Sequence, residues 1–90
     1  MKKSDIKAEI ASKVGNQSYD IWRIGLTHDL EERKKYWTET VKQNTKYWSQ
    51  WEADSLSDAQ DIELYFTDKG LKGGTGGDLS PDKTVFLYVF

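Results

Sequence analysis

The strongest constraint on the fold comes from two segments that read as β-strands yet carry apolar side chains on both faces. In residues 19–26 (YDIWRIGL), apolar side chains occupy both sets of alternating positions, and residues 85–90 (VFLYVF) are apolar throughout. A strand of this kind usually lies inside a sheet that is covered on each side. The chain is therefore expected to build a sheet with helices packed against it.

Three helical segments are available to cover that sheet. Ile6, Ile10 and Val14 recur every fourth residue, which predicts a helix over residues 4–14 with Ser4 as its N-cap and Gly15 just past its end. Asp29 followed by Glu32 has the form of a capping box, which predicts a helix from residue 30 to about 44. SLSDAQDIELYF (residues 55–66) supplies a third helix, for which Ser57 is the expected cap.

The remaining aromatic stretch, residues 47–53, predicts another strand. The expected fold is α+β: a small three-stranded sheet packed with about three helices, in the order α-β-α-β-α-β, within one domain over residues 1–90. A chain of 90 residues buries only about 60–65% of its unfolded surface. Its four tryptophans are therefore expected in the core rather than on a base-stacking surface.

Composition excludes several classes of site and partner. The chain has no cysteine and one histidine, so disulfide scaffolds, thiol catalysis and histidine-rich metal sites are excluded. No apolar run of about 18 residues occurs, so we expect a cytoplasmic protein with no membrane partner. The net charge of −2 weakly disfavours nucleic acid. That charge is uneven, because residues 31–47 are rich in Lys and Arg whereas residues 51–63 carry only acidic charges.

RIGLTHDLEER (residues 23–33) resembles part of the GIY-YIG nuclease domain. In that family a strand ends in Tyr-Ile-Gly and is followed by an Asp-Leu or Asn-Leu pair, with an arginine three residues beyond the leucine; here Arg23 stands in the place of the tyrosine. The family's later Ala and Glu, one helical turn apart, are similar to Ala59 and Glu63. The resemblance covers roughly residues 19–66. It implies that Arg33 contacts the scissile phosphate and that Glu63 holds one Mg²⁺ or Mn²⁺ ion.

The family's first strand, which carries a tyrosine that helps to activate water, has no counterpart before residue 19. We interpret residues 85–90 as a permuted replacement, with Tyr88 in the place of that tyrosine. This arrangement requires residues 85–90 to lie beside residues 19–26 in the sheet. His28 is a candidate base in such a site. The alternatives are that Arg33 is a solvated helix charge, Glu63 a solvated helix carboxylate and His28 a turn residue.

The last unusual feature is the glycine-rich loop of residues 70–77 (GLKGGTGG). Its backbone N–H groups could form a phosphate-binding nest to which Lys72 and Thr75 add a charge and a hydroxyl; the alternative is a flexible connector. Three functions stay open at this point. They are a GIY-YIG-like domain that binds a phosphate-bearing or nucleic-acid partner without efficient cleavage, a metal-dependent nuclease using Arg33 and Glu63, and a protein-interaction module.

Overall fold

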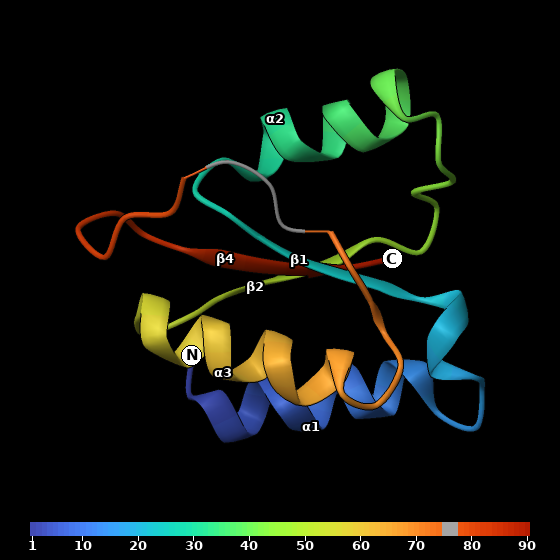
Figure 1. Ribbon diagram of the computed structural model, residues 1–90, viewed down its shortest axis with the longest axis horizontal. Helices are drawn as coiled ribbons and strands as arrows, with labels where there is room; N and C mark the ends of the chain where they lie inside the picture. The colour runs from blue at the N-terminus through green and yellow to red at the C-terminus, as the bar shows by residue number, and fades with distance from the viewer. Residues whose placement is uncertain (75–77) are drawn as a thin grey trace.

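A four-stranded mixed sheet forms the centre of the computed structural model, which describes residues 1–74 and 78–90 (Figure 1). The strands are β1 (Arg23–Thr27), β2 (Ser49–Glu52), β3 (Lys72–Gly73) and β4 (Phe86–Val89), and they lie in the order β2-β4-β1-β3. β4 runs antiparallel to both of its neighbours, whereas β3 runs parallel to β1. The α+β class is thus confirmed, but the sheet has four strands instead of the expected three.

Helices cover both faces of this sheet, as Figure 1 shows. α1 (Lys3–Val14) and α3 (Leu56–Thr67) pack against each other on one face, and α2 (Leu30–Lys35) lies on the other. α2 continues directly into a π-helical turn, η2 (Tyr36–Thr40). The main core lies between the sheet and the α1–α3 layer, where Ile6, Ile10 and Val14 are fully buried as their spacing predicts.

Alternation along the two central strands divides their side chains between the layers. Leu26 of β1 and Leu87 and Val89 of β4 belong to the main core. Gly25 and Tyr88, which are paired across the two strands, instead face α2. β4 is therefore buried on both faces, and its second face meets the helix that carries Arg33.

The capping signals are correct for two helix ends and wrong for two others. Gly15 ends α1 with φ 59°, and the Asp29 carboxylate accepts a hydrogen bond from the Glu32 N–H at 3.0 Å. α1 begins at Lys3 with Lys2 at the N-cap position and no side-chain cap, so the prediction for Ser4 is wrong.

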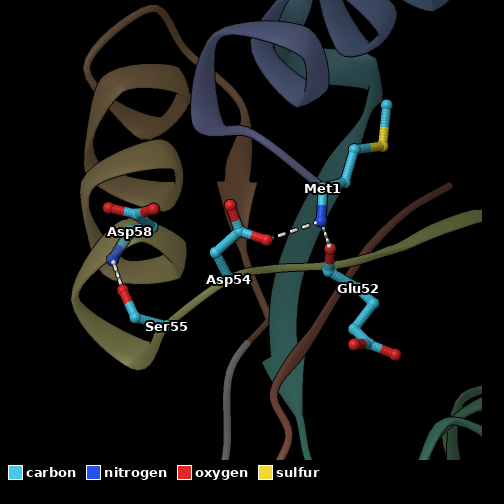
Figure 2. Close-up of polar contacts among 5 residues, drawn as sticks. All are labelled: Met1, Glu52, Asp54, Ser55 and Asp58. Carbon is cyan, nitrogen blue, oxygen red and sulfur yellow. Dashed lines mark hydrogen bonds and ion pairs between the residues drawn. The ribbon is translucent and has the colours of Figure 1, made fainter.

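Ser55, not Ser57, caps α3, because its hydroxyl accepts the Asp58 N–H at 3.0 Å (Figure 2). Close to this cap, the Met1 ammonium donates to the Asp54 carboxylate at 2.8 Å and to the Glu52 carbonyl at 3.2 Å (Figure 2). The hydrogen bond and ion pair with Asp54 raise the pKa of the amine. These contacts tie the start of the chain to the end of β2.

Three further boundaries differ from the sequence expectation. Residues 19–21 form a short 3-10 helix, η1 (Tyr19–Ile21), in which the Trp22 N–H donates to the Tyr19 carbonyl, so β1 begins only at Arg23. The helical segment expected to reach residue 44 ends at Thr40, since Lys42 has a left-handed φ of 62°. The unexpected strand, β3, arises because two residues of the glycine-rich loop pair with Arg23 and Ile24.

No helix in the described part of the chain is both long and apolar enough to cross a membrane.

Candidate functional site

Arg33 lies at the centre of a hydrogen-bonded cluster on the α2 face of the sheet. Its Nε donates to the Tyr88 hydroxyl at 3.2 Å, and its Nη2 donates to the Gly74 carbonyl at 2.8 Å. Its guanidinium also stacks over the Tyr36 ring, 4.5 Å from the centroid. The side chain is half-buried, so the interpretation of Arg33 as a fully solvated charge does not describe this conformation.

Tyr88 is fully buried, and its hydroxyl uses its full hydrogen-bonding capacity. It accepts from Arg33 Nε and from the Trp37 indole N–H, the latter at 2.9 Å, and it donates to the Gly74 carbonyl at 2.7 Å. The Tyr88 ring stacks on Trp48 with centroids 4.6 Å apart and planes 7° apart. These contacts hold the phenol in one orientation.

A second arginine, Arg23, completes this arrangement from β1. Its guanidinium lies 4.7 Å from the centroid of Trp37, and Arg33 lies 5.6 Å from that ring. Arg23 Nη1 donates to the Gly73 carbonyl at 3.0 Å, next to the Gly74 carbonyl held by Arg33. We call Arg23, Arg33, Trp37 and Tyr88 the arginine cluster.

Two glycines permit the close packing of this cluster. A Cβ at Gly25 would overlap the Tyr88 hydroxyl, so only glycine fits beneath that ring. A Cβ at Gly74 would lie 3.0 Å from Arg23 Cδ and from Trp37 Cζ2. Glycine at position 74 therefore has a structural explanation, because it lets the glycine-rich loop pack against the arginine cluster.

The sheet meets the geometric condition of the permuted arrangement. β4 pairs with β1 in antiparallel register, with Tyr88 opposite Gly25, so residues 86–89 lie beside residues 24–27. β4 also pairs with β2 on its other side, and it is therefore a central strand. The Tyr88 hydroxyl and Arg33 Nε, both candidates from the sequence, lie 3.2 Å apart.

His28, the candidate base, is held by two backbone groups. Its Nδ1 lies 2.8 Å from the Thr84 carbonyl, and its Nε2 lies 2.8 Å from the Ser80 N–H. A carbonyl accepts and an N–H donates, so this geometry requires the neutral ring with its proton on Nδ1. Both nitrogens thus fix the loop before β4, which is a structural role for this side chain.

Glu63 does not join the arginine cluster. It lies on α3, whereas Arg33 lies on α2, and these two helices cover opposite faces of the sheet (Figure 1). Within residues 1–74 and 78–90, no three acidic or histidine side chains gather in a way that could hold a metal ion.

Lys72 lies next to the arginine cluster, whereas Thr75 falls outside the described residues. Lys72 is exposed on β3 and is the register partner of Arg23. The side chains of register partners in adjacent strands project to the same side of a sheet, so Arg23 and Lys72 lie near each other at one end of this sheet.

Two pockets flank the arginine cluster and differ in charge. The first, of about 350 Å³, lies where β1 and β3 begin; we call it the amide pocket because Gln17, Gln43 and Asn44 line it. Arg23 and Lys72 also line it, and among the described residues no Asp or Glu side chain does. The second, of about 300 Å³, is lined by Arg33 together with the three carboxylates of Asp29, Glu32 and Asp78. An anion is therefore favoured in the amide pocket and disfavoured beside Arg33.

Sequence reasoning missed Arg23 and the amide pocket. The resemblance gives Arg23 only the place of a tyrosine. Its position in the alternation, between the core residues Trp22 and Ile24, indicates that its side chain lies on the other side of the sheet. The pocket has no such local signal, because its lining comes from five separate segments of the chain.

Comparison with known protein families, characterised proteins and solved structures gives no significant match to this chain.

Proposed function

We propose that the chain is a divergent GIY-YIG-like domain that binds a phosphate-bearing partner, a nucleic acid, without cleaving it efficiently. The observation that carries the proposal is the amide pocket, whose described lining includes Arg23 and Lys72 and no Asp or Glu side chain, in a chain whose net charge is −2. Local positive charge is what draws a polyanion to a surface, whatever the charge of the whole chain.

The family resemblance gains support from the centre of the sheet. β4 lies antiparallel beside β1, and the Tyr88 hydroxyl is 3.2 Å from Arg33 Nε. These are the strand pairing and the side-chain proximity that a permuted first strand requires. They are compatible with shared ancestry and do not by themselves indicate whether the domain cleaves its partner.

That chemistry favours binding over cleavage. Hydrolysis of a phosphodiester needs charge stabilisation and an activated water at one phosphate. Here the Gly74 carbonyl occupies donors of both Arg33 and Tyr88, the two groups that the resemblance assigns to the phosphate and to the water. Glu63, the implied metal ligand, lies on the helix of the opposite face. The groups of the nuclease mechanism are therefore not assembled around one phosphate.

Binding is tested with fluorescein-labelled single-stranded DNA, single-stranded RNA and duplex DNA, by anisotropy at a series of salt concentrations. We expect affinity to fall steadily as salt rises, because phosphate contacts release counterions. Lys72→Ala should weaken binding of every probe that carries phosphates. The matched control is Lys69→Ala, which removes the same charge next to α3, where Lys69 lies over Tyr65.

Cleavage is tested with the same probes and Mg²⁺ or Mn²⁺. We expect intact probes. The absence of binding to any probe at low salt would refute the proposal and favour a protein-interaction module. Metal-dependent cleavage that is lost in Arg33→Ala and in Glu63→Ala would establish the nuclease instead, whereas cleavage that survives both changes would come from a contaminant.

A further inference from the structure

The amide pocket combines three kinds of chemistry that a nucleotide carries. Arg23 and Lys72 suit a phosphate, the side-chain amides of Gln17, Gln43 and Asn44 suit the polar edge of a base, and aromatic rings suit its face. Its volume of about 350 Å³ lies at the lower end of the range for small-molecule sites, about 300–1,000 Å³. A single base with its sugar is a ligand of that scale.

The aromatic part of the pocket has a buried side and an exposed side. Trp22 is buried and Phe90 half-buried, and Phe90 is fixed by stacking on Trp48 at 5.2 Å. Tyr47 leaves 60% of its surface exposed, and Ile21 leaves 66% exposed. Large apolar side chains that line a pocket and remain this exposed are available to cover a ligand.

Charge around Tyr47 favours an anionic ligand over a neutral one. Lys46 Nζ lies 5.6 Å from the Tyr47 ring centroid. It is a third cation close to the pocket, in addition to Arg23 and Lys72, which line it. Asp20, the acidic neighbour of the lining residue Ile21, accepts a hydrogen bond from the Ser18 hydroxyl and does not line the pocket. A base that stacks on Tyr47 would keep its phosphate close to Lys46, Lys72 or Arg23.

The side-chain amides make the pocket better suited to a nucleobase than to a simple anion. Asn44 Oδ1 already accepts the Lys46 N–H at 2.9 Å, which orients the amide and leaves its NH₂ group as a donor. Gln43 is held through its backbone N–H, which donates to the Trp37 carbonyl at 2.9 Å, while its exposed side chain lines the pocket. Side-chain amides offer both donors and acceptors, the combination that base edges present.

We infer that the amide pocket accepts an unpaired base of a single-stranded nucleic acid, which stacks on Tyr47 while its flanking phosphate lies against Lys72 and Arg23. This inference rests on the proposed function and names its substrate class. A duplex is excluded by shape, because its bases are stacked inside and cannot enter a pocket unless one is flipped out. The lining of the pocket includes residues from η1 and from the segment that follows η2.

The test uses the full chain and three probes with matched labels: a 12-nucleotide oligothymidine, the same backbone made entirely of abasic sites, and a duplex of the same length. Stacking on an aromatic ring typically changes affinity about 5- to 150-fold. We expect the oligothymidine to bind at least about 5-fold more tightly than the abasic strand, and more tightly than the duplex. Unlabelled thymidine monophosphate is added as a competitor.

Tyr47→Ala should reduce the affinity for oligothymidine to that of the abasic strand and leave abasic binding unchanged. Lys72→Ala should weaken both probes by the same factor and flatten the salt dependence by about one phosphate contact, a slope change of about 0.7. Tyr65→Ala is the matched control, because Tyr65 is also an exposed tyrosine (42%) but lies on α3. It should change neither affinity.

The outcomes separate the two proposals. Equal binding of oligothymidine and abasic strand, with an effect of Lys72→Ala but none of Tyr47→Ala, would overturn the base pocket and keep the phosphate-binding function. No binding of any probe at low salt would overturn both. Displacement of the oligonucleotide by an equal concentration of thymidine monophosphate would also overturn the assignment, since the ligand would then be a free nucleotide.

Discussion

Removing the Tyr88 hydroxyl should destabilise the protein more than any other single-oxygen change on the α2 face. In Tyr88→Phe the ring keeps its stacking on Trp48, but the hydroxyl that joins Arg33, Trp37 and Gly74 is lost. The change therefore isolates the hydrogen bonds of the arginine cluster from its packing.

The magnitude follows from what each partner loses. The Trp37 side chain is only 6% exposed, so its indole N–H would have no water to replace the hydroxyl, at a cost of about 1–3 kcal/mol. The Arg33 guanidinium is half-buried and recovers part of its lost bond from solvent, for a further cost of about 1 kcal/mol. The Gly74 carbonyl keeps its bond to Arg33 Nη2. We expect a loss of about 2–4 kcal/mol in the free energy of unfolding.

Urea denaturation followed by circular dichroism measures this loss as a lower midpoint with an unchanged m-value. A domain of this size should also melt about 8–32 °C lower, because 1 kcal/mol corresponds to about 4–8 °C. Tyr65→Phe is the control: its side chain is 42% exposed, and we expect a change within about 0.5 kcal/mol.

A double-mutant cycle with Trp37→Phe gives a sharper criterion. If the indole N–H carries most of the penalty, the two changes should couple by at least about 1 kcal/mol. A cost below about 1 kcal/mol for Tyr88→Phe, with additive effects in the cycle, would mean that the hydroxyl does not hold the cluster together.

Three further predictions concern other parts of the molecule. Gly25→Ala should destabilise by about 2 kcal/mol or more, because the new Cβ would overlap the Tyr88 hydroxyl; a melting temperature equal to wild type would contradict this packing. Ser55→Ala should cost about 1 kcal/mol in urea denaturation through loss of the α3 cap, whereas Ser57→Ala should be nearly neutral. For a chain that begins at Met1, the raised pKa of its amine implies a contribution to stability that is full below the ordinary value of 8.0 and is lost as pH rises through the raised value. The stability advantage over Asp54→Asn should accordingly disappear as pH rises above 8.0 and through the raised pKa, and an advantage that is constant with pH would refute the ion pair.

Local signals in the sequence account for most elements of the fold. The spacing of Ile6, Ile10 and Val14 and the cap formed by Asp29 with Glu32 act within one or two helical turns, and both are confirmed. β3 could not be predicted in this way, because Lys-Gly has no strand propensity and pairs only where β1 offers an open edge. The choice of Ser55 over Ser57 as cap was likewise ambiguous, since each serine has a polar residue three positions later.

The candidate site was predictable only in part. Resemblance singled out Arg33 and Tyr88, and the structure joins them although they lie far apart in the sequence. The contact of Arg33 with the Gly74 carbonyl depends on how a loop returns over the sheet, and no pattern in the sequence encodes that return. The exposure of Tyr47 is another tertiary property, because an aromatic residue at the start of a predicted strand is equally consistent with a buried position.

The central position of β4 has a consequence for the route by which the protein folds. Both of its partners precede it by long stretches of chain, with Glu52 paired to Phe86 and Ile24 to Val89. β1 and β2 do not touch in the sheet, so neither gains an antiparallel neighbour until β4 arrives between them. Closing such large loops costs entropy before any pairing rewards it, which slows the search for the native state. The helices can form early, but the sheet should assemble in one late cooperative step, with the rate of folding controlled by the docking of a single four-residue strand.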